Sequence, residues 1–134
     1  MQLSSLLGHV QELLGNIRAS SKPADSLMEA FFRSHKYLGS HDRRFIAETT
    51  YGTLRNLRRC EFLLQSAIGD SAASVSREDG LLLLPVTFLV GIEHRTLVAA
   101  DITPPLSSMA LKNGIVSFLK NLVNDNPIPQ TDIA

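Results

Sequence analysis

The sequence predicts an all-α protein, a bundle of five to seven helices. Apolar residues recur at spacings of three and four along almost the whole chain, which is the period of an amphipathic helix. No alternating run of apolar and polar residues is long enough to predict a strand. With 134 residues, of which 44% are apolar, the chain is long enough to bury one core without disulfides or a metal.

Two helices are expected before residue 40. The second begins after Pro23, with Asp25 in its first turn, where a carboxylate is favourable. Gly39 is expected to end this helix in a left-handed conformation, and Ser40 to cap the next one. The first helix has an apolar stripe formed by Leu3, Leu6, Leu7, Val10, Leu13, Leu14 and Ile17.

A third helical pattern covers residues 41–68, which is long for one straight helix. Either this helix is central and buried on two faces, or it breaks near residues 55–58 into two packed segments. We favour the break. Tyr51 and Phe62 lie away from the main apolar stripe, which consists of Ile46, Thr50, Thr53, Leu57, Cys60 and Leu64.

In the C-terminal half, the sequence predicts a loop at residues 69–76 and then an apolar helix over residues 81–92. Pro85 must lie in the first turn of that helix or kink it. Thr103 is expected to cap a last helix, opened by the prolines that follow and ending near Val123. Residues 1–123 therefore form one domain, and residues 124–134 are interpreted as a linker or frayed C-terminus.

Charge is unevenly distributed although the net charge is zero. Residues 31–60 contain seven Lys and Arg but only two Asp and Glu, a bias typical of a surface that meets an anionic partner. The alternative is a solvated helix face with local ion pairs, such as Arg44 with Glu48. The candidate contacts are Arg33, Lys36, Arg43, Arg44, Arg55, Arg58 and Arg59.

Catalytic patterns are not found. The glycines form no phosphate-binding loop, and the four histidines are not at metal-ligand spacing with acids or with Cys60. Cys60 falls on the apolar stripe, where a cysteine behaves as a small buried hydrophobe. We therefore assign no catalytic, cofactor-binding or metal residue, and expect this chain to be non-catalytic.

The composition also bears on the compartment. A single cysteine excludes an internal disulfide and fits a reducing environment. No secretory signal is visible, and the most apolar run is about a dozen residues, short of the roughly 20 needed to span a bilayer. The sequence predicts a cytoplasmic protein without a membrane segment.

One segment carries a family pattern. Residues 42–55 read DRRFIAETTYGTLR. This segment resembles the D-R-x-F/L-(A/I)-x-E-x-x-Y-G-(T/V)-L-R signature in the N-terminal domain of bacterial Sun/NOP-type RNA cytosine-C5 methyltransferases, a domain similar to the antitermination protein NusB. The resemblance covers about residues 24–64. Residues 112–121 depart from it, because they lack the arginine of the family's G-F-V-N-x-x-L-R segment.

The resemblance implies a NusB-like fold and an RNA-binding accessory domain that takes part in rRNA or tRNA modification. Such enzymes use S-adenosylmethionine and cysteines in T-C-S and P-C motifs, none of which stands in these residues. The cofactor is therefore expected in a separate C-terminal catalytic domain. That domain and RNA would be the partners of this chain. The alternative is a free-standing NusB-like antitermination factor or a protein-interaction module.

The same resemblance implies that part of the segment 40–59 determines the fold. Asp42, Tyr51, Gly52 and Leu54 are expected in that role. Arg43 and Arg55 are the arginines that could instead fix helices through carbonyls or carboxylates. Because the aromatic residues Phe31, Phe45 and Tyr51 belong to apolar faces, we expect recognition of RNA shape and backbone rather than of bases.

Overall fold

The computed structural model describes residues 1–69 and 75–125. Over these residues the chain is helical, with seven α-helices, one short π-helix and no strand, which confirms the predicted all-α bundle. The elements are α1 (Leu3–Arg18), α2 (Ala24–Ser34), α3 (Ser40–Arg55), α4 (Leu57–Ile68), α5 (Arg77–Thr87), η2 (Phe88–Ile92), α6 (Ala99–Ile102) and α7 (Met109–Asp125). Helix α7 continues two residues past Val123, and most of the expected loop and C-terminal linker lies outside the described residues.

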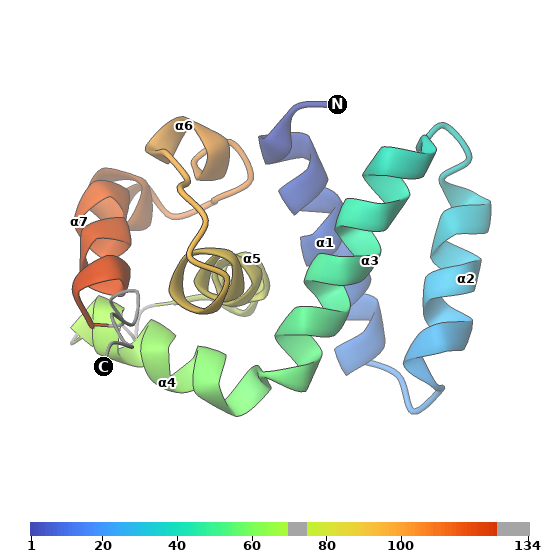
Figure 1. Ribbon diagram of the computed structural model, residues 1–134, viewed down its shortest axis with the longest axis horizontal. Helices are drawn as coiled ribbons and strands as arrows, with labels where there is room; N and C mark the ends of the chain where they lie inside the picture. Colours follow the sequence, from blue (N-terminus) through green and yellow to red (C-terminus); the bar gives the residue numbers. More distant parts are fainter. Residues whose placement is uncertain (70–74, 126–134) are drawn as a thin grey trace, which may run out of the picture.

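Helix α5 is the centre of the bundle. Figure 1 shows it nearly end-on, with α1, α2 and α3 on one side, α6 and α7 on the other, and α4 running below. Every residue from 81 to 91 is buried. A helix that is apolar on all sides is stable only when other elements surround it, so the apolar run at residues 81–92 accounts for this central position.

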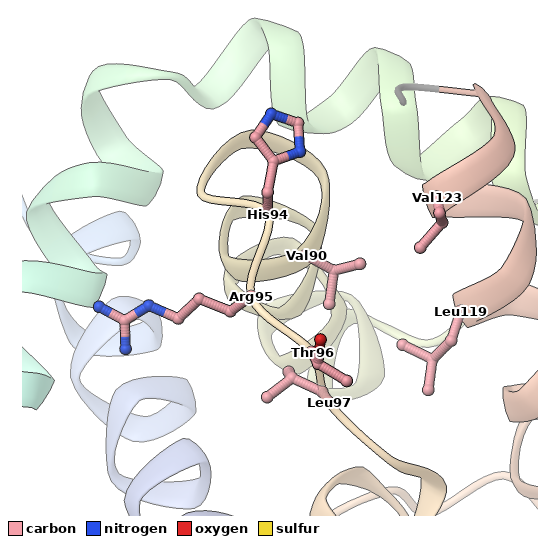
Figure 2. Close-up of a pocket in the computed structure, with 7 residues that line it drawn as sticks. All are labelled: Val90, His94, Arg95, Thr96, Leu97, Leu119 and Val123. Atoms are coloured by element: carbon pink, nitrogen blue, oxygen red, sulfur yellow. The ribbon is translucent and has the colours of Figure 1, made fainter. Parts of the chain in front are cut away.

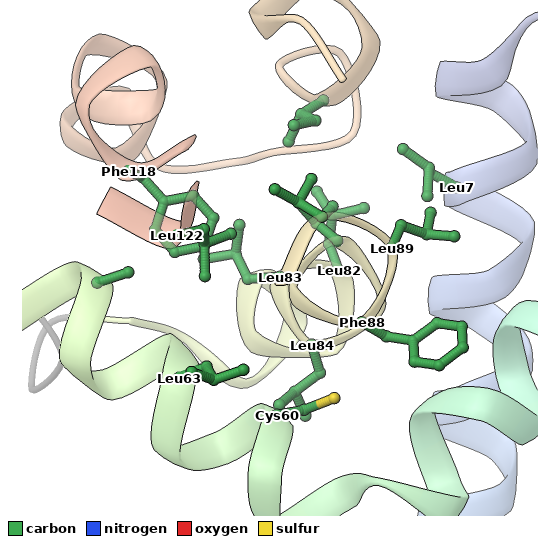
Figure 3. Close-up of a cluster of buried hydrophobic side chains, with 14 of the residues drawn as sticks. Leu7, Cys60, Leu63, Leu82, Leu83, Leu84, Phe88, Leu89, Phe118 and Leu122 are labelled. Carbon is green, nitrogen blue, oxygen red and sulfur yellow. The ribbon is translucent and has the colours of Figure 1, made fainter. Parts of the chain in front are cut away.

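Two apolar clusters make up the core. The larger one surrounds α5 and η2, and Figure 3 shows side chains from α1, α4 and α7, among them Leu7, Cys60 and Leu122, directed toward it. The smaller one lies between α1, α2 and α3 and is built around Leu13, Phe31 and Ile46 among others. The smaller cluster fixes the half of the molecule that carries most of the candidate basic residues.

The predicted break in the third helical pattern is confirmed, and it falls at Asn56. The Asn56 side-chain amide donates to the carbonyl of Gly52 at 2.8 Å, and its backbone N–H donates to the same oxygen at 3.1 Å. These bonds end α3, and α4 starts one residue later. Phe62 is 71% exposed, so the alternative of a helix buried on two faces is wrong. The predicted apolar stripe still holds on both sides of the break, because Ile46 and Cys60 are both fully buried.

The predicted roles of Gly39 and Ser40 are wrong. Helix α2 ends at Ser34, where the backbone N–H and the Nδ1 of His35 both bond to the carbonyl of Phe31, at 3.0 and 2.7 Å. The helix therefore stops before Gly39 is reached. Gly39 is extended, with φ −78° and ψ 177°, and Ser40 is already the first residue of α3.

Of the two alternatives predicted for Pro85, a position in the first turn of the helix is wrong. Helix α5 begins at Arg77, because the Ser76 hydroxyl accepts from the N–H of Asp79 at 3.1 Å. Pro85 is consequently the ninth residue of α5, past the first turn, and the π-helix η2 begins three residues later.

The last helix does not open at the prolines. Pro104 and Pro105 lie between α6 and α7, and α7 starts at Met109. The Ser108 hydroxyl accepts from the N–H of Leu111 at 3.3 Å, which places the cap of α7 after the prolines. The buried face of α7 contains Ile115 as predicted.

Candidate nucleic-acid interface

The seven predicted basic residues are all exposed, but the structure divides them. Arg33, Lys36 and Arg43 line one groove between α2 and the start of α3, together with Glu29 and Phe32; we call it the α2–α3 groove. Its volume is about 450 Å³. A second group, Arg55, Arg58 and Arg59, lies around the break at Asn56 and is called the elbow group. Arg43 and Arg55 are twelve residues apart on α3, which is about 18 Å along a helix.

Arg33 is paired within the α2–α3 groove. Its guanidinium lies 2.8 Å from the Glu29 carboxylate, one helical turn earlier. The two side chains are 66% and 74% exposed. An ion pair this exposed contributes little to stability, typically below about 1 kcal/mol, so its guanidinium can exchange the carboxylate for another anion at small cost.

Phe32 is fixed in the wall of the α2–α3 groove. Its ring makes a T-shaped contact with the ring of Phe31, with centroids 5.8 Å apart and planes at 75°. Phe31 is buried and in turn stacks on His35 at 4.0 Å. Phe32 remains half-buried, so its ring is held by the core on one side and reaches the groove on the other. The sequence pattern does not indicate that the ring of Phe32 reaches a groove.

A histidine–tyrosine contact involves Tyr37, which follows Lys36 in the chain. His9 on α1 lies with Nδ1 2.7 Å from the Ser5 carbonyl and Nε2 2.6 Å from the Tyr37 hydroxyl. Because a carbonyl only accepts, Nδ1 of neutral His9 carries the hydrogen and Nε2 accepts from Tyr37. This bond ties the segment after α2 to α1. Sequence reasoning did not find it, because no local pattern joins residues 28 positions apart.

Arg44 forms the ion pair that the sequence predicts. Its Nε lies 3.1 Å from the Glu48 carboxylate on the exposed face of α3. The expected contacts of Arg43 and Arg55 with carbonyls or carboxylates are not found: within the described part of the chain, neither makes a hydrogen bond or ion pair. Both guanidiniums are therefore open to an external partner.

The members of the elbow group lie at two different helix ends. Arg58 and Arg59 stand in the first turn of α4, at the end of a helix where positive charge is unfavourable. Arg55, in the last turn of α3, is on the favourable side of its helix. The local helix electrostatics thus account for Arg55 but not for Arg58, whose position favours a role in contact with an anion.

Cys60 is buried, as predicted. Its side chain belongs to the core beside α5, and burial raises the pKa of the thiol from 9.0 to about 11. A thiol with such a pKa is almost fully protonated at neutral pH and is a poor nucleophile. Across residues 1–69 and 75–125, no group of three or more His, Cys, Asp or Glu is arranged to hold a metal ion.

A separate pocket lies between η2, the following segment and α7 (Figure 2). Its volume is about 170 Å³, and its apolar lining includes Val90, Leu119 and Val123. The side chain of Arg95 points away from Leu119 and Val123. The pocket offers mainly apolar contacts, so the basic residues of the α2–α3 groove form a different kind of surface on another part of the molecule.

The fold and this surface define an all-α protein with a divided basic face. Comparisons with protein-family models, with curated proteins and with solved structures each found no match. No described helix has both the length and the apolar character to cross a membrane.

Proposed function

We propose that this chain is an RNA-binding accessory domain of an S-adenosylmethionine-dependent RNA cytosine-C5 methyltransferase. The observation that carries the proposal is the α2–α3 groove, which Arg33 at the end of α2, Lys36 in the segment after it and Arg43 in the first turn of α3 line together. The resemblance of residues 42–55 to the methyltransferase family supports it, since that segment forms most of α3.

The physical basis is phosphate neutralisation. Each Lys or Arg that contacts a phosphate displaces counterions, so binding weakens as salt rises. The molecule has no net charge, and seven of its 13 Lys and Arg residues lie within residues 31–60. Binding by this chain alone is therefore expected to be weak and steeply dependent on salt.

The chemistry would come from a neighbouring catalytic domain. That domain would hold S-adenosylmethionine and the nucleophilic cysteine, because Cys60 is buried and protonated. This chain would bind structured rRNA or tRNA and hold it near that domain. This chain would position the RNA, and the neighbouring domain would carry out the methyl transfer.

A charge-matched pair of variants tests the RNA contact. The triple variant Arg33→Gln, Lys36→Gln, Arg43→Gln removes three charges from the groove, and the control Arg77→Gln, Lys112→Gln, Lys120→Gln removes three elsewhere. Filter binding to rRNA across a salt series should show the slope of log affinity against log salt reduced by about 2 in the groove variant only. Equal slopes in both variants, or no RNA binding at low salt, would count against the proposal.

The gene sequence tests whether this chain is part of a methyltransferase. A reading frame that continues into an S-adenosylmethionine motif and paired catalytic cysteines supports the methyltransferase. A reading frame that stops at Ala134 favours the free-standing NusB-like factor instead.

A protein-interaction module is the second candidate, and α7 is the observation that favours it. Met109, Val116 and Val123 are 65%, 54% and 55% exposed and stand one heptad apart. Apolar residues at this spacing form one stripe that fits a partner helix. In this case Val116→Glu would abolish docking to the catalytic domain in calorimetry, and the groove variant would not.

A further inference from the structure

We infer that the α2–α3 groove accepts an unpaired nucleobase, with the ring of Phe32 as its stacking surface. The substrate class is then single-stranded RNA, or an unpaired loop of a folded RNA, rather than duplex. This inference rests on the proposed RNA-binding function and goes beyond it. It also replaces the expectation that the aromatic side chains serve packing alone.

The ring of Phe32 is fixed in place. It makes a T-shaped contact with the ring of Phe31, and Phe31 in turn stacks on the ring of His35. A side chain that is already ordered loses little conformational entropy when a ligand stacks on it. Every nucleobase has a π face, so such a platform binds bases with little regard to sequence.

Positively charged side chains line the groove around the ring of Phe32. Arg33, Lys36 and Arg43 line the same groove as Phe32, and they place cations where the phosphates on either side of a stacked nucleotide must lie. Glu29 is the acidic residue of the groove and can accept from an amino group on a base edge. The volume of about 450 Å³ lies within the roughly 300–1,000 Å³ typical of small-molecule sites.

Duplex RNA does not present its base faces to a ring inside a groove. In an A-form helix the base faces are covered by their neighbours, and side chains reach only the backbone and the shallow groove. A half-buried ring inside a groove has no access to those faces. The cations would still bind a duplex, but Phe32 would add nothing to that complex.

Phe62 is the aromatic residue to compare. It is 71% exposed on α4, four residues after Arg58. None of the described pockets includes it, and single exposed apolar side chains are common on protein surfaces. The same substitution at Phe62 therefore serves as a matched control.

Fluorescence gives the direct test, because the sequence contains no tryptophan. Phe32→Trp and Phe62→Trp each introduce one reporter, to be titrated with a short single-stranded RNA and with the duplex of the same sequence. We expect the single strand to quench the tryptophan at position 32 and leave the one at position 62 unchanged, and the duplex to quench neither. Quenching at position 62 alone, or equal quenching by duplex, overturns the inference.

Affinity gives the second measurement. Phe32→Leu keeps an apolar side chain but removes the aromatic face, so affinity for the single strand should fall about tenfold while affinity for the duplex stays unchanged. Phe62→Leu should change neither, and thermal melts should show that both variants are folded. If Phe32→Leu does not fold, the fluorescence result decides. Salt-dependent binding that is equal for both RNAs and unaffected by Phe32→Leu overturns the inference and leaves the proposed function standing; no binding of either RNA removes both.

Discussion

The carboxylate of Asp79, in the first turn of the central helix α5, binds Ser107 in the segment before α7. It accepts from the Ser107 N–H at 2.9 Å and from the Ser107 hydroxyl at 3.1 Å, and also from the N–H of Ser108 at 3.2 Å. Asp79 is only 1% exposed. A buried carboxylate is tolerated when its lone pairs are satisfied, and here that requirement joins the first turn of α5 to the start of α7.

Replacing Asp79 should therefore be costly. Asp79→Ala removes the acceptor of the Ser107 and Ser108 backbone N–H groups. We expect the free energy of unfolding to fall by about 2 kcal/mol in urea titrations at pH 7, because hydrogen bonds to a charged group are lost. Glu78→Ala is the control, because Glu78 is its exposed neighbour in the same helical turn, and the loss there should stay within about 1 kcal/mol. Equal losses in the two variants would contradict this role of Asp79.

Gly52 is required by the ring of Phe88. A Cβ at Gly52 would overlap the Cζ atom of Phe88, and Phe88 is itself buried. We expect Gly52→Ala to lower the free energy of unfolding by about 1–3 kcal/mol through overpacking, despite the better helix propensity of alanine. Denaturant unfolding of the variant measures this loss.

Gly114→Ala is the matched control for that substitution. Gly114 is exposed within α7, and a Cβ there would meet nothing within 4 Å. It should gain up to about 1 kcal/mol from helix propensity alone. The packing argument fails if Gly52→Ala stabilises the protein as Gly114→Ala does, or if Phe88→Leu does not reduce the cost of Gly52→Ala.

The fold was predictable where a periodic pattern determines burial. The stripe on α1 and the apolar run of α5 are of this kind, and both are buried as expected. Element ends were less predictable. His35 ends α2 before Gly39 through a local bond to the Phe31 carbonyl, and Asp79 fixes the segment just before α7 through Ser107, 28 residues away in the chain.

The candidate site was predictable only in part. Composition identified the basic residues, since exposed arginines stand out from an apolar stripe. Their division into a groove and an elbow group depends on how α2 packs beside α3, which spacing along one chain does not encode. The place of Phe32 in the groove was not predictable for the same reason, because the groove arises only when Arg43 comes alongside.

Tyr51 links α3 to the first turn of α2. Its hydroxyl donates to the carboxylate of Asp25, and this bond, with burial and the nearby negative charge, raises the pKa of Tyr51 above 10.0. A raised folded-state pKa means that this contribution to stability is complete below about pH 10 and is lost as the pH rises through the folded value.

Absorbance titration measures the effect of this bond. The chain has two tyrosines, so Tyr37→Phe leaves Tyr51 as the only one. In that background, Asp25→Asn should lower the pKa of Tyr51 toward its ordinary value, because it removes the charge and weakens the acceptor. An unchanged titration curve would show that Asp25 does not control Tyr51.

Cys60 should make stability depend on pH in alkaline solution. Burial raises the pKa of its thiol from 9.0 to about 11, so the unfolded chain loses this proton first. The contribution to the free energy of unfolding is therefore complete below pH 9 and decreases between about pH 9 and 11. Urea midpoints across this range should fall more for the wild type than for Cys60→Ala, which has no thiol to titrate.

The same burial predicts that iodoacetamide at pH 8 alkylates Cys60 slowly in the native protein and rapidly in urea. Parallel midpoint curves, or fast alkylation without denaturant, would mean that the thiol is not held in the core.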